Sequence, residues 1–107
     1  MESFWTIWVN ANKERGAEKL LKRVLKNMDA YGKEIKINPY HKGGYQIHFK
    51  LQHDEKSWND LVVECIALGQ KTAYDWKLLG DVFSDPSAAS TETSVSGVKM
   101  KEWCLFK

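Results

Sequence analysis

Alternation of side chains predicts a strand at the start of the chain. In residues 4–9, FWTIWV, both alternating sets of side chains are largely apolar. A strand with two apolar faces is expected in the interior of a sheet, covered on at least one side. This segment is therefore predicted to be a central strand.

The next segment follows the period of a helix. Apolar residues recur at i, i+3, i+4 and i+7 through residues 13–31, and Gly32 follows where a helix-ending glycine is expected. The opposite face is basic and comprises Lys13, Arg15, Lys19, Lys22, Arg23 and Lys26. The pattern predicts an amphipathic helix with a basic outer face.

Two alternating runs then predict a hairpin. Residues 34–38 and residues 45–51 each place apolar side chains on one face, and Pro39 opens a loop with paired glycines between them. Proline and glycine at such a position favour a turn.

A second helix is predicted to begin at Ser57. Asp60 lies three residues later, an arrangement similar to a capping box, and the apolar face runs from Trp58 to Ala73. Gly69 costs the helix about 1 kcal/mol relative to alanine, which indicates close packing on the sheet at that point.

The last third of the chain predicts two more strands. Residues 76–82, WKLLGDV, form the first of them, and residues 83–96 form a long polar loop. Loops of this length are either functional or loosely ordered. The ending VSGVKMKEWCLFK, residues 95–107, predicts the second strand.

Simple alternation divides this last strand into two faces. The face expected in the core carries Val98, Met100, Cys104 and Phe106. The face expected to be solvated carries Lys99, Lys101, Trp103, Leu105 and Lys107.

The order of these elements predicts an α+β fold. A ferredoxin-like βαββαβ arrangement, with an extra C-terminal strand, has an antiparallel sheet and two helices on one face. The last strand is expected to form a hairpin with residues 76–82. A length of 107 residues fits a single domain over residues 1–107.

Charge is distributed unevenly although the net charge is only +2. Residues 1–50 contain ten Lys or Arg and five Asp or Glu, residues 51–96 contain three and eight, and residues 97–107 contain three and one. Two interpretations are open: solvated faces that interleave on folding, or separate basic and acidic surfaces for partners.

The composition and termini predict a cytoplasmic globular protein. No apolar run reaches the ~18 residues of a membrane span, and the start MESFWTIWV lacks the features of a signal peptide. Cys65 and Cys104 are far apart in the sequence, which favours a reducing compartment and leaves a disulfide between them open.

No catalytic or metal-binding set stands out in the sequence. A nuclease that uses two histidines and a lysine could be built from His41, His48 and Lys50, but ordinary exposed histidines are the favoured interpretation. Neither HxH, HExxH nor CxxC spacing occurs. The protein is expected to have no enzyme activity, no metal and no cofactor.

Tryptophan is abundant for this length. The five tryptophans lie at positions 5, 8, 58, 76 and 103, and two of them facing the helices could fill the core. Tryptophan on an uncovered sheet face suggests protein binding, and a half-buried position at the sheet rim is the alternative.

Several segments resemble a known family. The FWTIWV strand, the YQIHF strand, the Ser-Trp helix start, YDWKLLGDV and the closing GVKMKEWCLF are similar to small immunity proteins of bacterial contact-dependent growth inhibition and related polymorphic toxin systems. Trp76 with Gly80, and the Gly-Val-x-x-x-x-Trp arrangement at residues 97–103, are the most suggestive parts. The layout also resembles ferredoxin-like regulator domains of ribonuclease E.

This resemblance implies a cytoplasmic inhibitor that binds a cognate toxin domain, such as a nuclease, and covers its active site. A monomer is favoured, and neither a membrane nor nucleic acid is the expected partner. The predicted partner contacts are Asp54, Glu55, Asp81, Asp85, Glu92, Trp103, Tyr40 and His41. The alternative is an RNA-binding or RNase-regulating module that uses the basic face of residues 13–31.

Overall fold

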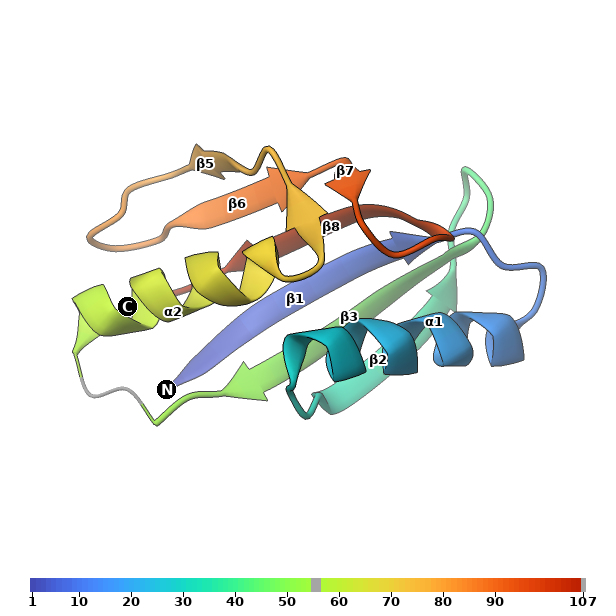
Figure 1. Ribbon diagram of the computed structural model, residues 1–107, viewed down its shortest axis with the longest axis horizontal. Helices are drawn as coiled ribbons and strands as arrows, with labels where there is room; N and C mark the ends of the chain where they lie inside the picture. The colour runs from blue at the N-terminus through green and yellow to red at the C-terminus, as the bar shows by residue number, and fades with distance from the viewer. Residues whose placement is uncertain (55–56, 107) are drawn as a thin grey trace.

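The computed structural model is an α+β fold with an antiparallel sheet and two helices on one of its faces (Figure 1). It describes residues 1–54 and 57–106. The helices are α1 (Glu14–Met28) and α2 (Trp58–Gln70). The strands are β1 (Glu2–Val9), β2 (Lys33–Pro39), β3 (Tyr45–Gln52), β4 (Ala73–Tyr74), β5 (Lys77–Leu79), β6 (Ser87–Ser90), β7 (Glu92–Thr93) and β8 (Val98–Cys104).

The main sheet has the order β2-β3-β1-β8-β6-β5, and β4 pairs with β7 in a separate small sheet. This arrangement is compatible with a ferredoxin-like fold. No helix in the described part of the chain is long and apolar enough to cross a membrane.

The predicted central position of β1 is confirmed. It lies between β3 and β8, so that Trp5 has Phe49 on one side and Trp103 on the other. Trp5, Ile7 and Val9 are buried, whereas the alternate residues of β1 are half-buried on the uncovered face of the sheet. Of the two apolar faces predicted for this strand, one is therefore covered by the helices and the other is partly open to solvent.

Helix α1 forms as predicted but ends earlier than expected. Ala17, Leu21, Val24 and Met28 are buried, and the basic residues of the opposite face are exposed. The helix was expected to reach residue 31, but Asp29 adopts the left-handed conformation (φ 54°) and ends it three residues before Gly32. Aspartate tolerates that conformation better than most residues, and the sequence pattern did not reveal it.

Helix α2 begins at the predicted cap. The backbone N–H of Asp60 donates to the Ser57 hydroxyl at 3.1 Å. The close packing expected at Gly69 is confirmed, because a Cβ there would lie 2.9 Å from the Trp76 indole. That neighbour is not in a strand, and Ala73, expected on the helix, begins β4 instead.

The predicted pairing of the last strand with residues 76–82 is wrong. Only Lys77–Leu79 forms a strand, β5, and it lies at the edge of the sheet. Strand β6, from within the expected loop 83–96, separates β5 from β8, which pairs with β1. The sequence of β6, SAAS, has no large apolar side chain, so alternation could not reveal it.

The predicted faces of β8 are also largely reversed. Lys101, Trp103 and Leu105 are buried, whereas Phe106 is 67% exposed. Val98 lies opposite Val9 while Met100 lies opposite Trp8, so Lys99 is an extra residue at this point of the pairing. A bulge of this kind shifts every later side chain to the other face.

Candidate partner-binding site

Large apolar side chains are exposed at and beside the β5 edge of the sheet. Their exposed fractions run from 47% for Val82 to 70% for Phe83. We call this set the edge cluster, and it comprises Tyr74, Leu78, Leu79, Val82 and Phe83. Apolar side chains gathered in this way mark interaction surfaces on soluble proteins.

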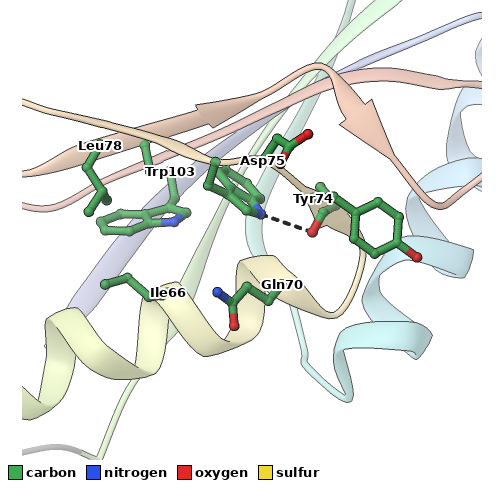
Figure 2. A pocket seen from close by; sticks show the side chains of 9 residues that line it. Ile66, Gln70, Tyr74, Asp75, Leu78 and Trp103 are labelled. Carbon is green, nitrogen blue, oxygen red and sulfur yellow. Dashed lines mark hydrogen bonds between the residues drawn. The ribbon is translucent and has the colours of Figure 1, made fainter.

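A pocket of about 480 Å³ opens between α2 and this edge (Figure 2). Ile66 and Gln70 line it from the helix side, Leu78 and Trp103 line it from the sheet side, and Asp75 lies between β4 and β5. The Trp76 indole N–H donates to the carbonyl of Ala73 at 3.2 Å. The pocket therefore has an apolar floor and a few polar groups around it.

The register of the sheet explains why this pocket exists. Leu78 lies opposite Ala88, which in turn lies opposite Trp103 across β5, β6 and β8. The small side chain of Ala88 leaves a hollow between its two larger neighbours on the helix-covered face of the sheet. The β5–β6 hairpin lies beside α2 (Figure 1), and residues of both elements line the pocket.

Two predicted contact residues, Asp81 and Asp85, lie on the turn that joins β5 to β6, and both are exposed. The Asp81 carboxylate accepts the backbone N–H of Phe83 at 2.8 Å, and the Asp85 carboxylate accepts that of Asp81 at 3.2 Å. The Trp58 indole also donates to the carbonyl of Val82 at 2.7 Å, which ties the turn to α2. The two carboxylates are thus held beside the edge cluster.

Two further carboxylates lie on the same side of the molecule. Glu92, another predicted contact, is exposed and lies opposite Tyr74 in the β4–β7 pair. Asp75 follows Tyr74 and is exposed with a left-handed backbone (φ 49°). Sequence reasoning missed Asp75 because it had no prediction for the short connection between β4 and β5.

The remaining predicted contacts are dispersed. Asp54 is exposed before α2, and Glu55 lies outside the described residues. Tyr40 and His41 lie on the β2–β3 turn at the other side of the sheet, with ring centroids 4.6 Å apart. The expectation that Trp103 lies on a solvated face is wrong, since it is 1% exposed and forms part of the pocket floor.

The edge cluster itself was also missed, although the sequence carries a signal for it. Leu78-Leu79 and Val82-Phe83 are adjacent apolar pairs. Neighbouring residues of a strand point to opposite faces, so an edge strand covered on one side cannot bury both Leu78 and Leu79, whereas Val82 and Phe83 lie on the turn that follows β5.

A second group of aromatic and basic residues lies on the uncovered sheet face. Phe4 and Trp8 of β1 are half-buried there, beside His48 and Lys50 of β3. The Lys50 ammonium lies 5.3 Å from the centre of the Phe4 ring and 2.5 Å from a Glu34 carboxylate oxygen. Hydrogen bonding within this ion pair lowers the pKa of Glu34 and raises that of Lys50.

Two buried polar clusters belong to the core rather than to a surface. The Ser3 hydroxyl accepts the Trp5 indole N–H at 2.7 Å and lies 2.6 Å from Nε2 of buried His53. Lys101 is fully buried, with its ammonium against the Thr72 hydroxyl and 5.5 Å from the Trp5 ring. Burial lowers the pKa of Lys101 to about 7.

Both cysteines are free in the structure, so the disulfide left open by the sequence does not form there. Burial raises the pKa of the Cys65 thiol to about 12, which keeps it protonated and unreactive at neutral pH. In the described residues, no group of three His, Cys, Asp or Glu side chains could hold a metal ion.

Comparison of the chain with protein-family models, curated proteins and solved structures gives no match. The candidate site therefore rests on its own geometry: an apolar sheet edge, a pocket beside it and two carboxylates held by backbone N–H groups.

Proposed function

We propose that this protein is a non-enzymatic inhibitor that binds a cognate toxin domain and covers its active site. It would act in the cytoplasm, as immunity proteins of contact-dependent growth inhibition do. The observation that carries the proposal is the edge cluster, whose exposed aromatic and aliphatic side chains lie next to a pocket. Large aromatic side chains at the centre of an interface supply most of its affinity.

The local charge at this edge supports the same proposal. Residues 74–85 contain Asp75, Asp81 and Asp85 but only one basic residue, Lys77. A toxin that cleaves nucleic acid needs a cationic cleft, and carboxylates complement such a cleft and speed the encounter. The net charge of +2 does not oppose this, because the acidic surface is local.

The sheet order is also in line with the family that the sequence resembles. The order β2-β3-β1-β8 is compatible with a ferredoxin-like sheet. In such a sheet β8, which the sequence predicted as the extra strand, would be the fourth strand, and β6 and β5 would extend it. On this interpretation the candidate site lies on the extension rather than on the common core.

A second candidate function is RNA binding. The uncovered sheet face favours it, because Phe4, Trp8, His48 and Lys50 share two adjacent central strands. RNA-binding sheets stack bases on aromatic side chains in that position. A salt titration of RNA affinity separates the two functions, since phosphate contacts require affinity to rise steeply at low salt.

Co-expression with the product of the adjacent upstream gene tests the inhibitor proposal. We expect the wild-type protein to co-purify with that product and to protect cells from it. Replacing Leu78 and Phe83 by glutamate should abolish both effects while circular dichroism stays unchanged, because both side chains are exposed. Tyr31→Glu is the matched control, since Tyr31 is 92% exposed and lies away from the site.

Two results would contradict the proposal. One is a wild-type protein that neither binds the neighbouring gene product nor protects against it. The other is full protection by the Leu78 and Phe83 double variant, which would exclude the edge cluster as the contact surface.

A further inference from the structure

We infer that the partner binds by adding a β-strand to the β5 edge of the sheet. The occupant is an extended segment of the toxin domain in which apolar and basic side chains alternate. This inference rests on the proposed function for the identity of the partner, whereas the strand site itself can be tested without it.

The two edges of the sheet differ in how well they are protected. At the β2 edge, Lys33, Glu34 and Lys36 are exposed, the register shifts between the two lysines, and Pro39 ends the strand. Charges, irregular register and proline are the features that prevent another strand from pairing with an edge.

The β5 edge carries fewer of these features. Leu78 and Leu79 are 60% and 61% exposed, the strand contains no proline, and Lys77 is its only charged residue. β5 ends the strand order of the sheet, so within residues 1–54 and 57–106 no further strand pairs with its outer backbone groups. Such an edge offers backbone hydrogen bonds to an extended segment.

The two faces of β5 differ in what they would offer to the side chains of an added strand. Leu78 points to the side of the pocket, where Ile66 and Trp103 leave room for an apolar side chain. Leu79 lies on the opposite face, since neighbouring residues alternate. An added strand would therefore place one alternating set of its side chains at the pocket, which suits apolar residues, and the other set on the open face beside Leu79.

Charge favours a basic segment over a second copy of this chain. The segment that forms this edge, residues 74–85, contains three acidic residues, Asp75, Asp81 and Asp85, but only one basic residue, Lys77. Two copies placed edge to edge would bring these carboxylates together, which is destabilising, whereas lysine or arginine on an added strand would pair with them.

A synthetic probe tests the site on the full chain. The probe is a fluorescent peptide of seven residues in which lysine alternates with valine or phenylalanine. One control peptide has proline in place of each valine, and another has glutamate in place of each lysine. We expect the probe to bind at least tenfold more tightly than either control, because the first cannot pair as a strand and the second has the wrong charge.

Protein variants locate the binding. Leu78→Glu should weaken the probe at least tenfold, whereas Ile35→Glu, on the opposite edge and 45% exposed in the wild type, should not change its affinity. Amide hydrogen exchange within residues 77–79 should slow when the probe is bound. Equal binding of the proline peptide, or no effect of Leu78→Glu, would overturn the inference.

The remaining outcomes separate this inference from the proposed function. Sedimentation that shows a wild-type dimer, lost in Leu78→Glu, would make a second copy the occupant and overturn the inference. If the probe binds as expected but the toxin domain does not, the strand site stands and the proposed function fails. If the toxin domain binds without protecting the amides of residues 77–79, the function stands and the strand addition fails.

Discussion

Lys101 shows how far a single residue can depart from the position that its charge predicts. Its side chain is fully buried against Thr72, Met28 and Trp5, and no carboxylate in the described residues pairs with it. An unpaired buried charge is costly, and the protein reduces this cost by lowering the pKa from 10.5 to about 7. The burial follows from the bulge at Lys99, which alternation could not reveal.

This burial predicts that the free energy of unfolding rises between pH 7 and pH 9. In that range the unfolded chain holds a proton on Lys101 that the folded chain has released, so higher pH favours folding. Below about pH 7 both the folded and the unfolded chain hold this proton. Burial of the charged ammonium then lowers the free energy of unfolding by its full amount, on the order of 5 kcal/mol at most. Above pH 9 the raised pKa of Cys65 acts in the opposite direction.

Denaturant unfolding at several pH values measures this effect. Lys101→Met should raise the free energy of unfolding at pH 7 by about 2 kcal/mol or more, because replacing a buried charged group by an apolar one of similar size often stabilises a protein. The variant should also show a smaller change of stability with pH. Lys99→Met is the control, because Lys99 is exposed. A wild-type profile that is flat from pH 7 to pH 9 would show that Lys101 reaches solvent.

At the scale of elements, hydrophobic periodicity predicted the N-terminal half well. The central strand, the basic helix, the hairpin and the Ser57 cap all form, because each has a clear period or cap. The C-terminal half was mispredicted because β6 uses small residues and β8 contains a bulge. In the same way, the sequence located Asp85 in an exposed loop but placed Asp81 in the preceding strand, and it could not reveal the pocket, which depends on the pairing of Ala88.

The bulge in β8 predicts that Leu105→Ala destabilises the protein more than Phe106→Ala does, which is the reverse of what simple alternation predicts. Leu105 is fully buried, whereas Phe106 is 67% exposed and touches Phe4 edge-on. Leu105→Ala should therefore cost about 2–5 kcal/mol of stability as a cavity-forming change, and Phe106→Ala about 1 kcal/mol or less. Simple alternation from Val98 requires the opposite order. Chemical denaturation of both variants decides between the two patterns.

At the scale of the whole molecule, charge is separated rather than interleaved. Helix α1, with its basic outer face, packs on β2 and β3, whereas the carboxylates of residues 74–85 surround β5 at the other edge of the sheet. Of the two interpretations of the uneven sequence, separate basic and acidic surfaces fit this arrangement. Basic residues therefore predominate on α1 and acidic residues around β5, and such a separation of charge can orient an approaching partner.

This polarity predicts how the acidic turn acts in binding the toxin domain. Replacing both Asp81 and Asp85 by asparagine removes two charges but keeps the side-chain oxygens that accept the backbone N–H groups of the turn. The association rate should fall about tenfold at low salt and lose most of its salt dependence, while the dissociation rate and the stability change little. Glu18→Gln on the exposed face of α1 is the control. Stopped-flow measurements of the association rate at several salt concentrations test this prediction. If the toxin domain approaches through the basic side instead, the double variant should associate at the wild-type rate.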